Sequence, residues 1–337
     1  TGMPLLTSLS ARGLVADDHP LCFEGAVAVR PGCGFAAYLE TDLVIVLGTR
    51  LSLYYLFGDI FNPAAKIVQV DIEPGEIGRN RTIDLPVVSD IKGFLTLCNR
   101  EMERRGSANE LPQKFDGWIK KLRQAHEESK AMNMPNWTSE EIPIHPMRLA
   151  HEINEFMNKE SDIVIADGGD TTTWMGMTRT MSCAGRYLDY GIFGSLAVGL
   201  PYANTAKLLH PDSRVCLITG DGSVGFNFME FETAIRKGLP IVVVISNDLG
   251  WGMIRHSQEL RIGHAIETGT YIGKVDYHKM VEAIGGKGFL VEDPEDIRPT
   301  MEAAFASKTV CCINVMTDPT TVSPASTMLA NIGAYKA

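Results

Sequence analysis

The feature that most constrains the fold is a pair of acidic turns, each of which follows an apolar run. Gly220-Asp221-Gly222-Ser223 follows residues 215–219, and Asn247-Asp248 follows residues 241–246, with Asp248 27 positions after Asp221. A segment of helix length, residues 226–238, lies between them. A strand–helix–strand unit of this kind predicts two parallel strands that bring both carboxylates to one edge of a sheet, where such sheets bind ligands.

Two ligand classes fit this pattern. Two acids beside glycine-rich backbone suit an oxygen-coordinated divalent cation, and such a cation suits a diphosphate. Residues 220–225 also fit the Gly-x-Gly-x-x-Gly pattern of dinucleotide-binding turns, and Asp248 lies where a ribose-binding acid would lie. Asp221 inside that turn would repel a pyrophosphate unless a metal lies between them. The pattern therefore favours a metal–diphosphate site and leaves nicotinamide binding as the alternative.

The length and net charge of the chain limit the number of domains and the kinds of partner that we expect. A chain of 337 residues predicts two domains, each large enough for its own core. The net charge of −10 argues against nucleic acid or an anionic membrane as a partner, so a bound anion needs a local metal or a helix N-terminus. No apolar run approaches transmembrane length and no signal peptide precedes the first strand, so we expect a cytoplasmic protein.

Seven cysteines are present, and none forms a Cys-x-x-Cys pair. An odd number without that spacing fits a disulfide framework poorly. Cys216, Cys311 and Cys312 lie inside apolar runs, which favours their interpretation as small core residues.

Alternating apolar and amphipathic segments predict an α/β fold with two domains, each a parallel sheet flanked by helices. We expect one domain over residues 1–105, a polar linker over 106–145 and a second domain over 146–337. In the second domain we expect helices at 147–157 and 277–284, strands at 162–166 and 310–316, and an irregular tail from Thr317.

The stretch from Gly220 to Asp248 resembles the thiamine diphosphate motif, a Gly-Asp-Gly followed at this spacing by a pair usually written Asn-Asn. Residues 166–170, 190–201 and 248–255 resemble the cofactor site of acetolactate synthases, benzaldehyde lyase and their relatives, and residues 4–13, 42–48 and 67–74 resemble their central, Rossmann-like domain. The resemblance covers nearly the whole chain. It implies that the chain opens partway into the central domain and lacks the N-terminal pyrimidine domain, which carries the activating glutamate.

The resemblance implies a set of binding residues. Asp221 and Asp248 would bind Mg²⁺ through their side chains and Gly250 through its carbonyl, although relatives usually have asparagine at position 248. The diphosphate would meet the backbone at a glycine-rich turn and the end of the preceding strand; these residues are Gly220, Gly222, Ser223, Asp170 and Thr171.

Other residues would shape the cofactor and its pocket. Leu196 takes the place of the apolar wedge that bends the cofactor, and the Gly194 carbonyl would accept a hydrogen bond from its amino group. Met253 would face the pocket. Ser257 stands where acetolactate synthases have a tryptophan, and His256 is either a pocket acid–base group or a surface histidine. No catalytic residue is assigned in this chain.

The resemblance implies a thiamine diphosphate- and Mg²⁺-dependent lyase or carboligase that acts on a carbonyl substrate, a 2-keto acid or a 2-hydroxy ketone. Because active sites of this family form between subunits, it also implies a homodimer or homotetramer. FAD binding stays open, with Gly48-Thr49-Arg50 as its candidate phosphate contact. Two other functions stay open as well: a nicotinamide-dependent oxidoreductase, and a cofactor-binding module without catalysis.

Overall fold

The computed structural model describes residues 1–7, 11–23, 27, 32–106 and 111–331. Its contacts divide the chain into two compact units, one formed by residues 1–8 and 19–130 and the other by residues 9–18 and 131–337. Both units contain parallel sheets with helices, which confirms the predicted α/β class. The boundaries at residues 105 and 146 stay predictions. Residues 8–10 of the central-domain motif and residues 332–337 of the expected tail lie outside the described residues.

The second unit is built on a six-stranded sheet in which all pairings are parallel. The strand order is β10-β11-β9-β8-β6-β7. Strands β6, β8 and β9 are therefore neighbours, and their carboxyl ends share one edge. The strands are β6 (Ile163–Asp167), β7 (Tyr187–Leu188), β8 (Val215–Gly220), β9 (Val242–Asn247), β10 (Lys287–Val291) and β11 (Cys311–Met316).

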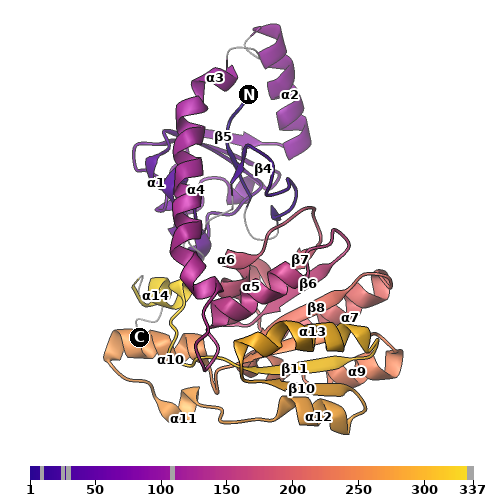
Figure 1. Cartoon of the computed structure of the whole chain (residues 1–337). Coiled ribbons are helices and arrows are strands. Elements are labelled where there is room, and N and C mark those ends of the chain that lie inside the picture. Colours follow the sequence, from indigo (N-terminus) through magenta and orange to yellow (C-terminus); the bar gives the residue numbers. More distant parts are fainter. Residues whose placement is uncertain (8–10, 24–26, 28–31, 107–110, 332–337) are drawn as a thin grey trace. The chain divides into compact units, whose positions relative to one another are not determined.

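Helices cover both faces of this sheet (Figure 1). One face packs against α5 (Pro146–Phe156), α6 (Gly169–Thr178) and α13 (Ile297–Ala306). The other packs against α7 (Gly199–Leu209), α9 (Glu230–Lys237) and α12 (Tyr277–Ala283). Burial on both faces explains why the central strands are continuous apolar runs without alternation.

The cysteines of the sheet are core residues, as predicted. Cys216 and Cys311 pack on one face and Cys312 on the other, and all three are fully buried. Burial raises the pKa of the Cys216 thiol to about 12 and also raises that of Cys312. Both thiols are therefore protonated at neutral pH, which makes them poor nucleophiles.

The first unit contains two smaller parallel sheets, β1-β2 and β3-β4-β5. Part of its core lies between Phe23, Ala37 and the α4 residue Leu122. Helices α3 and α4 lie within residues 106–145, the segment expected to be a linker. The elements are β1 (Leu5–Leu6), β2 (Cys22–Phe23), α1 (Phe35–Glu40), β3 (Leu43–Leu47), β4 (Lys66–Asp71), β5 (Leu85–Val88), α2 (Ile91–Arg104), α3 (Leu111–Lys114) and α4 (Asp116–Trp137).

Two expectations for the second unit were wrong in detail. The segment expected as one helix at 226–238 contains the end of α8 (Asp221–Phe226) and all of α9, because Asn227 leaves the helical conformation and its amide donates to the Ala197 carbonyl at 2.8 Å. The tail expected to be irregular contains α14 (Pro324–Asn331). The Ser323 hydroxyl accepts from the Ser326 N–H at 3.1 Å and caps this helix, and Pro324 occupies its first position.

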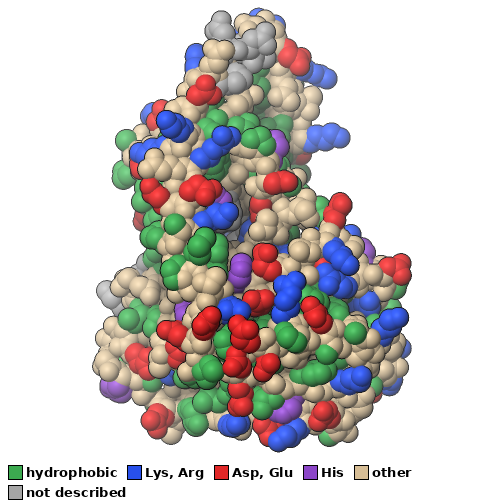
Figure 2. All heavy atoms as spheres, viewed as in Figure 1, with side chains coloured by type: hydrophobic (Ala, Val, Ile, Leu, Met, Phe, Trp, Pro, Cys, Tyr) green, Lys and Arg blue, Asp and Glu red, His purple; other side chains and the backbone are tan. Residues whose placement is uncertain are grey.

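Charge is distributed over the surface as a mixture. On the face that Figure 2 shows, acidic and basic side chains lie interspersed among apolar ones. On this face, then, an anionic ligand would be recognised by local groups rather than by a broad basic surface. Among the described residues, no helix combines the length and the apolar character needed to cross a membrane.

The packing predicts a contrast between two leucines of the second unit. Leu217 of β8 is fully buried, whereas Leu208 of α7 is 67% exposed. Leu217→Ala leaves a cavity and should lower the free energy of unfolding by about 2–5 kcal/mol, whereas Leu208→Ala should change it by less than about 0.5 kcal/mol. Urea denaturation followed by circular dichroism measures both, and equal effects would contradict this packing.

Candidate cofactor and metal site

Three neighbouring strands end in the residues singled out from the sequence. Strand β8 ends at Gly220 and is followed by Asp221, and β9 ends at Asn247 and is followed by Asp248. Strand β6 ends at Asp167, and α6 begins two residues later. Since β9, β8 and β6 are adjacent, all three turns meet at the carboxyl edge of one sheet within the second unit.

Asp221 is a buried carboxylate with unmet hydrogen-bonding capacity. Its Oδ1 accepts from the Gly222 N–H at 2.9 Å, but its Oδ2 has no partner. Burial and then the neighbouring Asp248 carboxylate raise the pKa of Asp221 to about 8. Burial also raises the pKa of Asp248, against the opposing effect of Arg255. A divalent cation would offset the repulsion between the carboxylates and would give the unpaired oxygen a partner.

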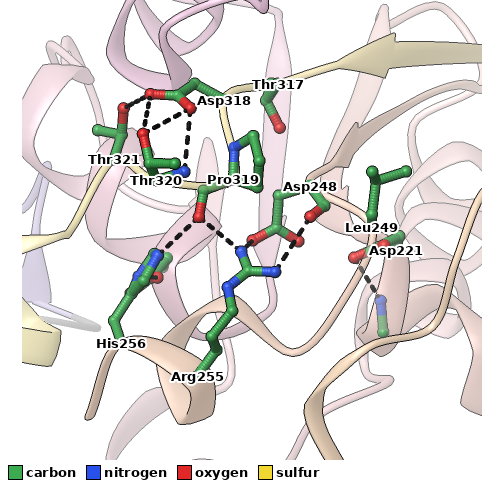
Figure 3. Close-up of polar contacts among 12 residues, drawn as sticks. Asp221, Asp248, Leu249, Arg255, His256, Thr317, Asp318, Pro319, Thr320 and Thr321 are labelled. Carbon is green, nitrogen blue, oxygen red and sulfur yellow. Dashed lines mark hydrogen bonds and ion pairs between the residues drawn. The ribbon is translucent and has the colours of Figure 1, made fainter. Parts of the chain in front are cut away.

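Arg255 partly compensates the second carboxylate. Figure 3 shows its guanidinium between Asp248 and the Pro319 carbonyl. The Nη2 atom donates to Asp248 Oδ2 at 3.0 Å and to the Pro319 oxygen at 2.7 Å. A permanently charged side chain thus holds one of the two acids, which leaves Asp221 without a basic partner.

The turn after Asp248 is tightly constrained. A Cβ added at Gly250 would lie 2.3 Å from the Thr270 carbonyl oxygen, so only glycine fits. The Trp251 N–H donates to the same oxygen at 2.8 Å, and Leu249 has a φ of 66°, in the left-handed region. The Gly250 N–H bonds to the Asp221 carboxylate, and this bond lowers the pKa of Asp221. Burial and Asp248 have larger effects and raise it. These contacts fix the turn beside both acids.

No group of three or more His, Cys, Asp or Glu side chains forms a metal site within the described ranges. A cation at the acid pair would complete its shell with backbone oxygens, waters and oxygens from a bound anion. A diphosphate supplies oxygens of this kind.

The glycine-rich turn is closely packed. Helix α8 begins at Asp221, and Gly222 and Ser223 are buried. A Cβ added at Gly222 would lie 2.7 Å from the Trp251 ring, so this ring covers the turn. The Thr171 hydroxyl lies next to Gly220, 3.4 Å from where a Cβ would stand. The structure therefore brings Thr171 from α6 to the same turn.

The loop at 191–199 carries Gly194 and Leu196. The 3₁₀ turn η5 (Gly191–Phe193) leads to Gly194, which is exposed, and Leu196 is half-buried. The next residue, Ala197, is fixed because its N–H donates to Asp167 Oδ1 and to Ser223 Oγ, both at 3.2 Å. The loop is thus tied to the turns that follow β6 and β8.

Asp167 is the residue whose importance sequence reasoning missed. It is 1% exposed, and its carboxylate accepts from the N–H groups of Gly168, Ala197 and Gly199 at 2.8–3.2 Å. Burial raises the pKa of Asp167, against the lowering effect of these bonds. An acid placed directly at the end of an apolar strand was the available signal. Its three donors could not be identified from the sequence, because two of them lie about 30 residues away along the chain.

Helix α10 (Gly252–Ile262) provides further residues. The side chain of Met253 packs against Gly169, within 2.8 Å of where a Cβ would stand. The Ser257 hydroxyl donates to the Met253 carbonyl at 2.7 Å and is buried within the helix. His256 is 1% exposed, so its interpretation as a surface histidine was wrong. It contacts Asp170, the first-turn acid of α6.

Arg50, the candidate flavin contact, belongs to the first unit. It follows β3, and its Nε lies 3.3 Å from Glu76 Oε1 in an ion pair. A carboxylate at this distance competes with a phosphate for the guanidinium.

The chain matches two protein-family models. Residues 167–315 match the thiamine pyrophosphate enzyme, C-terminal TPP binding domain, and residues 1–97 match the thiamine pyrophosphate enzyme, central domain. The chain belongs to the thiamine pyrophosphate enzymes. The matched C-terminal segment includes β8 and β9 with the turns that follow them, and Asp167 at the end of β6.

Named relatives agree with this family. The acetolactate synthase large subunit IlvG of Mycobacterium tuberculosis is 32% identical over 97% of this chain and 57% of its own length. A probable acetolactate synthase large subunit of Methanocaldococcus jannaschii is 30% identical over 96% of this chain and 54% of its own. A 2-hydroxyacyl-CoA lyase of Arabidopsis thaliana is 28% identical over 95% and 55%. The chain therefore spans a little more than half the length of these relatives.

Family membership supports thiamine diphosphate as the cofactor of this site. It gives no support for the nicotinamide alternative or for FAD. The acid pair fits the metal that a diphosphate needs, because Asp221 Oδ2 is buried and unpartnered.

The Asp167 contacts predict a specific loss. Asp167→Asn places an amide donor where a carboxylate oxygen accepts from backbone N–H groups, and one unmet donor costs about 1–3 kcal/mol. Amide exchange in residues 194–199 should accelerate and the free energy of unfolding should fall. Asp212→Asn, at an exposed acid of the same unit, is the control and should change neither. An unchanged loop in Asp167→Asn would show that the carboxylate does not hold it.

The His256 contacts predict a pH dependence. Burial lowers the pKa of His256, but bonds to Asp170 and to the Pro319 carbonyl outweigh it and raise the pKa overall. The protonated ring stabilises the folded state. This stabilisation is fully present below the pKa of His256 in the unfolded chain, about 6.5, and it is lost as the pH rises through the pKa of His256 in the folded chain. Asp170→Asn should lower the titration midpoint of His256 in an NMR experiment. A midpoint below the ordinary value in the wild type would contradict the protonated ring.

Proposed function

We propose that this chain is part of a thiamine diphosphate- and Mg²⁺-dependent enzyme that cleaves or forms C–C bonds in 2-keto acids or 2-hydroxy ketones. The observation that carries the proposal is the pair of acids, buried Asp221 and half-buried Asp248, at the ends of adjacent strands inside the segment that matches the C-terminal family domain. The names of the relatives support a carboligase or lyase, since they include acetolactate synthases and 2-hydroxyacyl-CoA lyases.

The proposed metal ligands are the side chains of Asp221 and Asp248 and the carbonyl of Gly250. The support is chemical: two carboxylate oxygens and a carbonyl are hard ligands suited to Mg²⁺, and diphosphate oxygens would complete the shell. Asp248 keeps the Arg255 guanidinium at 3.0 Å, so its second negative charge is balanced within the protein. Asp221, with its unpaired Oδ2, is then the acid that depends most on the cation.

The diphosphate would lie on the turn at Gly220, Gly222 and Ser223, with the Thr171 hydroxyl beside it. We assign these contacts to backbone N–H groups and to Thr171, because the Ser223 hydroxyl accepts from the Ala197 N–H and also bonds to the Asp167 carboxylate. Gly194, Leu196 and Met253 would contact the rings of the cofactor. When bound, thiamine diphosphate supplies the nucleophilic carbon and the electron sink for the reaction, while these residues bind and orient it.

Several features of the whole protein remain proposals. We assign no catalytic residue within residues 1–337, and we place the activating glutamate in an N-terminal pyrimidine domain. A homodimer or homotetramer, a cytoplasmic location and a carbonyl substrate are proposed on the family resemblance. Ser257 lies buried inside α10, where acetolactate synthases have a tryptophan, so the substrate pocket should differ from theirs.

The site predicts different effects for its two acids. Asp221→Asn removes the acid without a basic partner and should weaken Mg²⁺-dependent binding of thiamine diphosphate by about tenfold or more. Asp248→Asn restores the residue usual in relatives and should keep binding within about threefold. Isothermal titration calorimetry with thiamine diphosphate, with and without Mg²⁺, measures both.

The exposed-acid variant Asp212→Asn is the control and should bind as the wild type does. Binding of NADH in place of thiamine diphosphate, or Mg²⁺-independent binding that Asp221→Asn leaves intact, would exclude the proposed site. A protein that binds the cofactor but turns over no 2-keto acid or 2-hydroxy ketone would favour a non-catalytic module.

A further inference from the structure

We propose that Asp170 is a positioning residue, which with His256 anchors the C-terminal segment 319–331 beside the cofactor site and makes no contact with the diphosphate. This inference refines the proposed function at one of its candidate residues. It rests on the contacts of the Asp170 carboxylate, all of which lie within the second unit.

Both oxygens of Asp170 are engaged by protein groups. The hydroxyls of Ser323 and Ser326 donate to its Oδ1, the latter at 2.8 Å, and Oδ2 lies 3.2 Å from His256 Nδ1. The Asp170 carboxylate thus has three partners: one from α10, one from α14 and one from the residue that caps α14. An ionised carboxylate has no proton to donate, so it offers a diphosphate only repulsion.

The His256 ring extends this anchor. Its Nε2 lies 2.9 Å from the Pro319 carbonyl oxygen, which can only accept. Asp170 is likewise an acceptor, so both ring nitrogens carry protons and the ring is a cation. A buried imidazolium between a carboxylate and a carbonyl joins α6 to the start of the C-terminal segment. Figure 3 shows its contact with the Pro319 carbonyl.

The anchor also reaches the proposed metal ligands. The Pro319 carbonyl accepts from both His256 and Arg255, and Arg255 in turn holds Asp248. Helix α14 packs along α10, which supplies both cations, and contacts α6 as well. The segment therefore lies against the metal-binding end of the sheet through charged hydrogen bonds, which are the stronger kind.

Hydrogen–deuterium exchange of the full chain tests the anchor. Asp170→Ala removes the common acceptor, and the double variant Ser323→Ala/Ser326→Ala removes its donors on the C-terminal side. Each should accelerate exchange in residues 319–331 by about tenfold or more. Thr327→Ala changes an exposed residue of α14 whose hydroxyl donates to the Ser323 carbonyl, and it should change exchange less than about twofold. Unchanged protection of β8 and β9 would show that the fold is intact.

Two comparisons separate positioning from ligand contact. Combining Asp170→Ala with the double serine variant should accelerate exchange no further than Asp170→Ala alone, since the groups act as one unit. In Asp170→Asn the amide oxygen can still accept from the serine hydroxyls, and the amide nitrogen can donate to a neutral His256. This variant should therefore exchange slowly in residues 319–331, unlike Asp170→Ala. The dissociation constant for thiamine diphosphate with Mg²⁺ should shift by the same factor in Asp170→Ala and in the serine variant.

The inference is overturned if residues 319–331 stay protected in Asp170→Ala, or if that variant alone loses affinity for thiamine diphosphate. Absence of cofactor binding in the wild type would refute the proposed function instead, and the exchange experiment would still decide whether Asp170 anchors the segment.

Discussion

The site depends on the enforced proximity of two carboxylates, buried Asp221 and half-buried Asp248. Strands β8 and β9 are paired in register, so Asp221 and Asp248 emerge from adjacent strand ends and cannot separate without breaking the sheet. Burial raises the pKa of both, and the neighbouring Asp248 carboxylate raises that of Asp221 further. A parallel sheet with helices on both faces is rigid enough to hold such an arrangement, whereas a flexible loop would let the acids move apart.

The surrounding polar groups divide into two systems. Asp167 organises the loop at 191–199 by accepting from backbone N–H groups, and within the described part of the chain it forms no ion pair with a basic side chain. Asp170 and Asp248 are instead matched by the adjacent cations His256 and Arg255 of α10, which share the Pro319 carbonyl. One system shapes the pocket for the cofactor and the other joins the metal-binding end to the C-terminal segment.

The sequence predicted the parts of the structure that depend on local pattern. The apolar runs before Asp221 and Asp248 became neighbouring parallel strands, because a run of that length followed by a helix admits few topologies. Ser323 followed by Pro324 is also a local signal, since this pair is typical of the start of a helix such as α14. The contacts of Asp167, Asp170 and His256 could not be predicted, because their partners, apart from the adjacent Gly168, lie 30–156 positions away in sequence.

The Arg255–Asp248 pair explains how a carboxylate is tolerated where the family resemblance places asparagine. Asparagine would present one neutral oxygen to a cation, and aspartate adds a charge that must be balanced in a buried site. Arg255 lies one turn along α10 and reaches back to Asp248 at 3.0 Å, so it supplies that balance locally. Because the same guanidinium bonds to Pro319 at 2.7 Å, the aspartate at this proposed metal-ligand position and the placement of the C-terminal segment are physically linked.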